Sequence, residues 1–292
     1  MKQILVTGAT GNVGMAVVHF LTTKKKDIQI IAGVRNIMKA RTVLKDYPGI
    51  IFRNFDLEKP HVHDLALEAV DTVFLVRPPH LSDVPRHFEP LLKSMKNNNI
   101  REVMFLSVQG AERSRVIPHH KIEKLILKYD FDYIFLRPGY FMQNLTTTLH
   151  HSIVNEKKIV LPAGEAKFNW IDVENIGELG AELLTRFEEF RRRAYDVTGY
   201  DNLNFNEVTD LMNEYLPVKI EYKDVNPVAF YRLKKREGMP RGMRLVMIML
   251  HFLPRYLKEP VISGFYEKIT GKRPTTLREF VLREKNRLAG GS

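Results

Sequence analysis

The sequence contains no cysteine, a single tryptophan and no long apolar run. Without cysteine, the chain can have no disulfide bonds, no thiolate metal sites and no cysteine nucleophile. The longest apolar run, Leu245–Leu250, is far shorter than the roughly 20 residues that a membrane-spanning helix needs. Met1 leads directly into a strand-like run that lacks the features of a secretion signal. We therefore expect a soluble, cytoplasmic protein.

The composition excludes collagen-like proteins and disordered proteins. With 17 glycines, 15 prolines and 44% hydrophobic residues among 292, the chain is neither collagen-like nor disordered. The net charge of +11 is a local feature, because residues 232–292 hold 15 basic and 5 acidic side chains. The rest of the chain is close to neutral. The overall charge is therefore a poor guide to function.

The chain from Met1 to Arg137 alternates short β-rich runs with stretches of helical period. Val13, Ala16, Val17, Phe20 and Leu21 have the spacing of an amphipathic helix. Continuous apolar strands between such helices are typical of a parallel sheet that is covered on both faces. The sequence therefore predicts an α/β fold with a Rossmann-type, doubly wound parallel sheet. The predicted strands are Ile4–Val6, Ile28–Ala32, Ile50–Phe55, Thr72–Val76, Val103–Leu106 and Tyr133–Leu136.

Helices predominate after Arg137. We divide the chain into a core over residues 1–137 and a smaller, mainly helical lobe over residues 138–292, which interleaves with the core. Thr276 and Glu279 have the spacing of a capping box that begins the last helix. In the second region we predict strands at Ile159–Leu161, Tyr195–Thr198 and Val218–Tyr222, and helices that begin near Asn175 and Asn206.

A glycine-rich segment, TGATGNVG at residues 7–14, separates the first predicted strand from the first helix. Gly8 permits a tight turn, Gly11 lets the backbone approach a pyrophosphate, and Gly14 lets the helix pack close to the strand. The helix N-terminus then offers N–H groups and a positive dipole to phosphates. An ordinary strand–helix turn is the alternative. The position at the start of a βαβ unit favours nucleotide binding.

The end of the second predicted strand distinguishes NADP from NAD. A site for NAD places Asp or Glu there to bind the ribose 2′-hydroxyl, whereas Arg accommodates the 2′-phosphate of NADP. This strand ends in AGVRN, and no acidic residue follows Arg35 before Asp46. Arg35 offers a planar, permanent cation. NADP(H) is therefore the predicted cofactor, and a solvated surface arginine is the alternative.

These two segments, together with LRPGYFMQN at residues 136–144, resemble the NmrA-like family. Its members are atypical short-chain dehydrogenase/reductase relatives that include NADPH:quinone oxidoreductases and NADP-sensing regulators. The resemblance runs from Met1 to about residue 230. Topology independently supports the contacts that follow the third and fourth strands, because ligands bind at the carboxyl ends of such strands. The cofactor contacts that the resemblance implies are Gly8, Ala9, Thr10, Gly11, Asn12, Val13, Arg35, Asp56, Val76 and Arg77.

The Tyr–Lys pair of the wider superfamily is absent. In that superfamily the Lys cation lowers the pKa of a Tyr four residues earlier, and the phenol transfers the proton as hydride moves. In the helix that contains Glu123, His119 occupies the Lys position and Arg115 the Tyr position. His119 is therefore the candidate catalytic residue, which would bind the nicotinamide ribose or supply a proton near neutral pH. The alternative is an ordinary helix residue packed beside His120.

Aromatic residues after the sixth strand indicate where an acceptor binds. Quinone reduction needs little acid–base chemistry, because hydride passes directly to a planar electrophile. Tyr140, Phe141 and Trp170 are predicted walls of the acceptor pocket, and Asn144 is its polar contact. Packing in an ordinary core is an equal alternative for each aromatic residue.

The function predicted from these features is an NAD(P)H-dependent oxidoreductase that prefers NADPH and reduces a small quinone or carbonyl electrophile. One alternative is a non-catalytic, NADP-sensing regulatory protein that binds a partner protein. A second is a nucleotide-sugar epimerase, which the missing Tyr–Lys pair disfavours.

The basic C-terminal helices lie where the resemblance is thinnest. Residues 239–256 combine arginines with a run of apolar side chains. A lid or ordinary packing is the favoured interpretation, ahead of a homodimer interface or a peripheral contact with an anionic membrane. Nucleic acid is not an expected partner, because no recognised motif accompanies the charge. No metal site is predicted, since adjacent histidines on a helix do not face one ion together.

Overall fold

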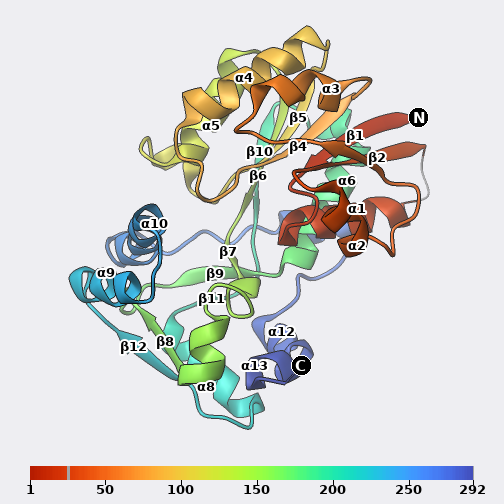
Figure 1. Cartoon of the computed structure of the whole chain (residues 1–292). Coiled ribbons are helices and arrows are strands. Elements are labelled where there is room, and N and C mark those ends of the chain that lie inside the picture. Colours follow the sequence, from red (N-terminus) through yellow and green to blue (C-terminus); the bar gives the residue numbers. More distant parts are fainter. Residues whose placement is uncertain (25–26, 292) are drawn as a thin grey trace. The chain divides into compact units, whose positions relative to one another are not determined.

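The computed structural model describes residues 1–24 and 27–291, which form two compact units (Figure 1). Unit 1 comprises Met1–Pro138, Val173–Val197 and Phe265–Lys272. Unit 2 comprises Gly139–Asp172, Thr198–Gly264 and the residues from Arg273 onward. Two later segments of the chain thus return to the unit that holds its N-terminal part.

Unit 1 is built on a parallel sheet, which in the described residues has seven strands in the order β10-β6-β5-β4-β1-β2-β3. The predicted doubly wound parallel sheet is confirmed, and each strand predicted before Arg137 is present. The chain runs outward from β1 through β2 to β3 and then restarts at β4 on the other side of β1. The strands are β1 (Lys2–Thr7), β2 (Ile28–Val34), β3 (Ile51–Asn54), β4 (Thr72–Val76), β5 (Glu102–Leu106), β6 (Asp132–Pro138) and β10 (Arg193–Val197).

Helices cover both faces of this sheet (Figure 1). On one face α1 packs against α6 so closely that a Cβ on Gly177 would lie 2.5 Å from the Ala16 Cβ. On the other face α3, α4 and α5 enclose an apolar core with the sheet. The helices are α1 (Asn12–Thr23), α2 (Ile37–Val43), α3 (His63–Leu67), α4 (Val84–Asn97), α5 (Pro118–Lys128), α6 (Val173–Thr185), α7 (Phe187–Phe190) and α11 (Phe265–Thr270).

Unit 2 surrounds an aromatic core that includes Phe168, Trp170 and Phe205. Its short strands pair in the orders β11-β9-β7 and β12-β8. The strands are β7 (Tyr140–Phe141), β8 (Lys158–Leu161), β9 (Phe168–Ile171), β11 (Asn202–Leu203) and β12 (Glu221–Asp224). The helices are α8 (Phe205–Tyr215), α9 (Pro227–Arg236), α10 (Arg241–Phe252), α12 (Leu277–Arg283) and α13 (Lys285–Ala289).

Predicted boundaries after residue 138 are less accurate than those before it. The capping box of Thr276 and Glu279 is confirmed at the start of α12. The strand predicted at 218–222 begins only at Glu221, and the helix predicted from Asn175 begins at Val173. The predictions missed β7, β9 and β11. Two of these strands are two residues long, which is too short to show the alternation that identifies a strand.

Candidate functional site

The glycine-rich segment forms the turn between β1 and α1. Gly8 has a φ of +62°, in the left-handed region that favours glycine. The Gly11 N–H donates to the Gly8 carbonyl over 2.8 Å and closes the turn. A Cβ on Gly14 would lie 2.2 Å from the Gly8 oxygen. Glycine at position 14 therefore lets α1 approach the turn this closely.

The N-terminus of α1 is open toward this turn. Its N-cap residue is Gly11, so no side chain caps the helix, and its first turn contains no acidic residue. Thr10 and Asn12 are exposed, whereas Ala9 and Val13 are buried. The N–H groups of the first turn and the positive end of the helix dipole are thus available to an anion.

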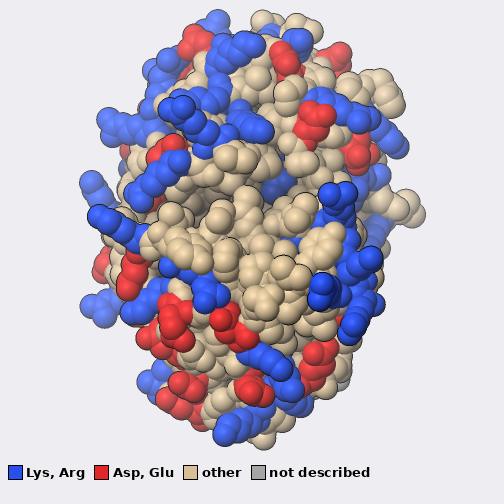
Figure 2. Space-filling view, turned by 90° about the vertical axis from the view of Figure 1, so that its left-hand side faces the viewer, with Lys and Arg blue, Asp and Glu red and all other residues tan. Residues whose placement is uncertain are grey.

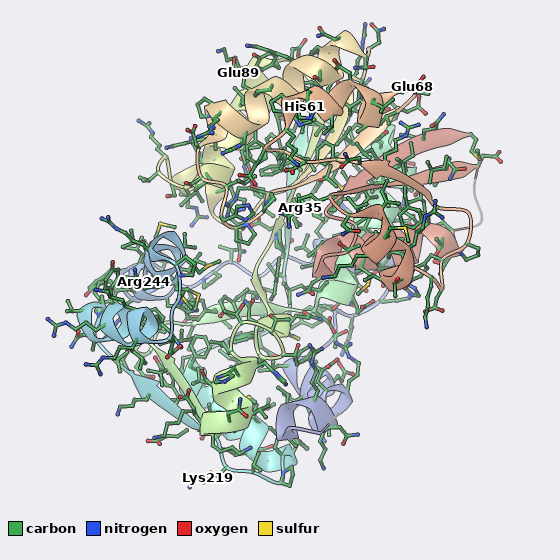
Figure 3. All side chains as sticks on the ribbon, in the orientation of Figure 1. Arg35, His61, Glu68, Glu89, Lys219 and Arg244 are labelled. Atoms are coloured by element: carbon green, nitrogen blue, oxygen red, sulfur yellow. The ribbon has the colours of Figure 1, made fainter. Side chains whose placement is uncertain are left out.

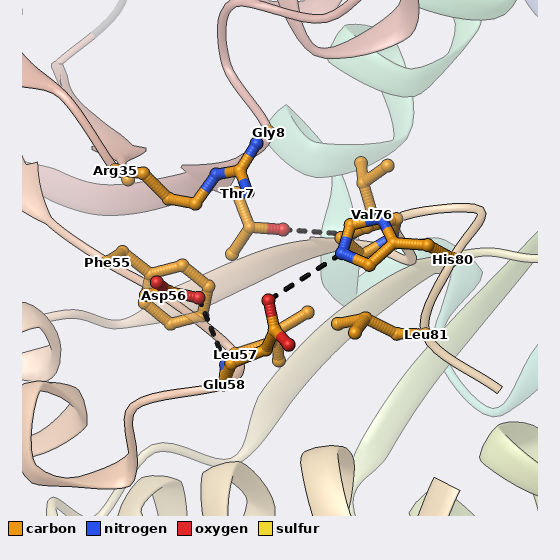
Figure 4. Close-up of a pocket in the computed structure, with 12 residues that line it drawn as sticks. Thr7, Gly8, Arg35, Phe55, Asp56, Leu57, Glu58, Val76, His80 and Leu81 are labelled. Carbon is orange, nitrogen blue, oxygen red and sulfur yellow. Dashed lines mark hydrogen bonds and ion pairs between the residues drawn. The ribbon is translucent and has the colours of Figure 1, made fainter. Parts of the chain in front are cut away.

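A cavity lies beside the turn, at the carboxyl ends of β1 to β4 (Figure 4). Thr7 joins two of these strands: its hydroxyl donates to the Phe74 carbonyl over 3.0 Å and accepts from the Val76 N–H over 2.8 Å. The strand order reverses at β1, which is where ligands bind in such sheets. The cavity is lined by Thr7, Gly8, Gly33, Arg35, Phe55, Asp56, Leu57, Glu58, Val76, Pro78, His80 and Leu81.

Four predicted cofactor residues, Gly8, Arg35, Asp56 and Val76, are among these lining residues. Arg35 is exposed, and no hydrogen bond or ion pair joins it to the other residues drawn in Figure 4. The Asp56 carboxylate accepts the Glu58 N–H over 3.0 Å. The cavity therefore presents a free guanidinium and a carboxylate to a ligand.

Sequence reasoning missed the other lining residues, which belong mainly to the loops after β3 and β4. Glu58 and His80 face each other there across 3.7 Å (Figure 4). Phe55, Leu57 and Leu81 add apolar walls. These loops carry no recognised motif. In the sequence, only their position directly after a predicted strand indicates that their residues could line a ligand site.

His119 is the second residue of α5 and lies against Arg77. The Arg77 Nε donates to the His119 Nε2 over 3.4 Å. Because Nε2 accepts, the neutral ring carries its proton on Nδ1. Burial and the Arg77 cation lower the pKa of His119 to about 3. The ring is therefore neutral at pH 7 and offers an Nδ1–H donor.

Arg77 is not among the residues that line the cavity. Its Nη1 donates to the carbonyls of Pro78, Pro79 and Leu81 at 2.9 to 3.0 Å. Burial lowers the pKa of Arg77 to about 10, which still leaves it charged at pH 7. Arg77 thus shapes the loop that contributes Pro78 and Leu81 to the cavity wall.

A buried ion pair follows His119 on α5. The Glu123 carboxylate accepts from Arg137 Nε over 2.9 Å and from Arg137 Nη2 over 2.6 Å. The Ser107 hydroxyl, at the end of β5, donates to the same carboxylate over 2.6 Å. Arg115 precedes α5 and lies outside it. The Ser107 hydroxyl is therefore directed at Glu123, and no Tyr–Lys pair is present at these positions of α5.

The predicted acceptor residues all belong to unit 2. Tyr140 and Phe141 form β7 and are partly exposed, and so is Asn144 at the end of the short helical turn that follows. Trp170 is 1% exposed, and its Nε1 donates to the Leu203 carbonyl over 3.0 Å. Trp170 is therefore a buried residue that packs against the Tyr140 ring and does not line an exposed pocket wall.

A buried histidine fixes the Tyr140 hydroxyl. His251 Nδ1 lies 2.7 Å from the Met247 carbonyl, which can only accept, so Nδ1 carries the proton. Tyr140 then donates to His251 Nε2 over 3.0 Å. Burial raises the pKa of Tyr140 and lowers the pKa of His251 to about 4. Both groups are neutral at pH 7.

Exposed apolar side chains lie on α10 and on the segment that follows it. Leu245 and Leu250, on α10, are 50% and 46% exposed, and Leu253 and Leu257, after the helix, are 51% and 69% exposed. Figure 2 views the side on which α9 and α10 lie, where uncharged surface is bordered by lysine and arginine side chains. Among the described helices, none has the length and apolar character needed to cross a membrane. The described residues also contain no cluster of three potential metal ligands.

Comparison with known proteins matches residues 1–281 to the model of the NmrA-like family. Prestalk A differentiation protein A of Dictyostelium discoideum is 28% identical over 278 residues, 95% of this chain and 91% of that one. NAD(P)H azoreductase of Xenophilus azovorans is 28% identical over 285 residues, 95% of this chain and 96% of that one. The solved structure of Citrobacter sp. triphenylmethane reductase with NADP(H) has the same fold, with a TM-score of 0.83, 24% identity and coverage of 97% and 99%.

Proposed function

This chain belongs to the NmrA-like family, and from that premise we propose that it is an oxidoreductase that uses NADPH to reduce a small quinone or carbonyl electrophile. The observation that carries the proposal is the cavity beside the open N-terminus of α1, with Arg35 on its wall, bonded to none of the other residues drawn in Figure 4. The name of one relative, an NAD(P)H azoreductase, supports reductive chemistry with this class of cofactor.

The chemistry of the cavity fits the parts of NADPH. The open N-terminus of α1 suits the pyrophosphate, because its N–H groups are uncapped. Arg35 suits the 2′-phosphate, since no ion pair joins its planar cation to Asp56 or Glu58, the two carboxylates drawn in Figure 4. Asp56 can accept from an adenine amino group, while Leu57 and Leu81 offer apolar walls to a flat base.

When bound, NADPH supplies the hydride, and the side chains of this protein bind and orient the reactants. The neutral His119 ring, held by Arg77, would donate its Nδ1–H to a ribose hydroxyl of the bound cofactor. Tyr140 and Phe141, with Asn144 beside them, remain our proposed acceptor residues, and the buried Trp170 supports them. Neither His119 nor His251 is protonated at pH 7, so neither is proposed as the acid that protonates the reduced acceptor.

The low pKa of His119 predicts how turnover depends on pH. A histidine with a pKa of about 3 stays neutral from pH 6 to 8, so kcat/KM should show no His119 inflection in that range. We expect His119→Gln, which keeps an acceptor for Arg77, to lose less activity than His119→Ala. A general acid contributes roughly 10²- to 10⁴-fold. A loss of that size in both variants, with an inflection near pH 6.5 in the parent protein, would contradict this role.

The proposed activity is tested by mixing the purified chain with NADPH and a panel of quinones and aldehydes. The absorbance of the reduced nicotinamide is followed over time. We expect at least one acceptor to accelerate NADPH oxidation well above the rate without acceptor. Tight NADPH binding without oxidation by any acceptor would overturn the proposal.

The second candidate, a dinucleotide-sensing regulatory protein, is favoured by one specific feature. Ser107 is held by Glu123, and Arg115 replaces the superfamily Tyr outside α5, so the usual proton donors are missing. Direct hydride transfer to a quinone does not need those donors. The acceptor panel therefore also decides between the two candidates.

A further inference from the structure

Arg244, on α10, is a buried cation that forms no ion pair within the described residues. It is 7% exposed, and its Nε and Nη1 atoms are buried without a hydrogen-bond partner in the part of the chain that the structure describes. Figure 3 places Arg244 where α9 and α10 lie side by side, within unit 2. A guanidinium left unpaired inside a protein is strongly unfavourable, unless a partner completes the site.

The acidic side chains of this region are engaged by other cations. Glu237, at the end of α9, pairs with Lys234 over 2.7 Å. Asp224 pairs with Arg255 over 3.3 Å. The charge of Arg244 is therefore not neutralised by these carboxylates.

The surroundings of Arg244 are aromatic and apolar. Its guanidinium carbon lies 4.3 Å from the centre of the Tyr231 ring, so one face of the cation is covered. Met247 and Ile248 follow Arg244 at helical spacing, and Met243 precedes it. Methionine side chains are unbranched and adapt to irregular shapes. Side chains of this kind would suit an apolar group next to an anion that the guanidinium binds.

We propose that Arg244 is the anchor of a binding site for a small organic anion, a carboxylate or sulfonate carried on an apolar body. The guanidinium would donate its unpaired N–H groups to the anionic oxygens. Tyr231 and the methionines of α10 would contact the apolar part. This site does not depend on NADPH and belongs to a different unit from Arg35. Its test is therefore independent of whether the proposed oxidoreductase activity is correct.

The ligand is tested with 2-naphthalenesulfonate and its uncharged counterpart of similar shape, 2-naphthalenesulfonamide, by calorimetric titration of the full chain. We expect saturable binding of the sulfonate and at least about tenfold weaker binding of the sulfonamide, as for hydrogen bonds to a charged group. Inorganic phosphate should bind more weakly than the sulfonate. Equal binding of sulfonate and sulfonamide, or of sulfonate and phosphate, would overturn the proposal.

Variants then locate the site. Arg244→Met should weaken sulfonate binding at least about tenfold. Arg241→Met, which removes an exposed arginine three residues earlier on α10, should change it less than about twofold. Arg35→Ala should leave it unchanged. Equal losses in Arg244→Met and Arg241→Met, or a loss in Arg35→Ala alone, would overturn the assignment.

Thermal unfolding without ligand distinguishes an arginine that binds a ligand from one that stabilises the fold. Removing an unpaired buried charge should leave Tm unchanged or raise it by about 2–4 °C in Arg244→Met. A marked fall in Tm would show that Arg244 stabilises the fold and would overturn its assignment to a ligand. The sulfonate and sulfonamide comparison is made on the unaltered chain, so it tests ligand binding without any variant.

Discussion

Gly14→Ala is expected to reduce dinucleotide affinity about tenfold to 100-fold. Its new Cβ would lie 2.2 Å from the Gly8 oxygen and 2.8 Å from the Gly8 carbonyl carbon. Overpacking of a filled site costs about 1–3 kcal/mol, and backbone atoms cannot rotate aside as a flexible side chain does. A loss of about 1.4 kcal/mol corresponds to a tenfold loss of affinity. Calorimetric titration with NADPH measures the loss of affinity, and a thermal melt measures the loss of stability.

A matched variant controls for the change of residue type. Gly242 is in the first turn of α10 and has no atom within 4 Å of the place where a Cβ would be. Gly242→Ala should therefore bind NADPH normally and unfold at the same or a slightly higher temperature. Unchanged NADPH binding in Gly14→Ala would show that the turn does not hold the pyrophosphate.

Arg35→Ala is expected to weaken NADPH binding tenfold to about 100-fold while changing NADH binding less than about threefold. A hydrogen bond to a charged group contributes about 1.5–3 kcal/mol, and only NADPH carries the 2′-phosphate that Arg35 would contact. Arg35 is exposed and unpaired at the cavity in Figure 4, so its removal leaves no buried charge behind. Titration of both nucleotides into both proteins gives the ratio directly.

The control for this variant is Arg101→Ala. Arg101 is also exposed, but it precedes β5 and so lies at the opposite end of the sheet from the cavity. Its replacement should alter neither affinity. If Arg35→Ala weakened NADPH and NADH binding equally, Arg35 would have no role in recognising the 2′-phosphate.

Unit 1 could be predicted from the sequence because its signals are local. The strands β1, β2, β4, β5 and β6 each contain a short, buried apolar run, and α1 repeats its apolar residues at helical spacing. The turn at Gly8 carries its own glycine pattern. The short strands β7 and β11 carry no such pattern, because two residues cannot show a period. They form only when distant segments such as β9 pair with them.

The chemistry of the candidate site was less predictable, because it depends on contacts between distant residues. His119 reads as a proton donor in the sequence, yet burial beside Arg77, 42 residues away, makes it neutral at pH 7. Glu58 and His80 reach the cavity from loops without a motif. In the sequence, Arg244 is one of several arginines in residues 239–256, and only the packing of α9 on α10 shows that it is buried with two nitrogen atoms that lack a partner among the described residues.

A crystal structure of the chain with NADP bound tests the central claim most directly. We expect the pyrophosphate at the Gly8–Gly11 turn, the 2′-phosphate within hydrogen-bonding distance of Arg35, and the adenine between Asp56 and Leu81. NADP bound elsewhere, or bound here with its 2′-phosphate away from Arg35, would contradict the assignment of this cavity as an NADPH site.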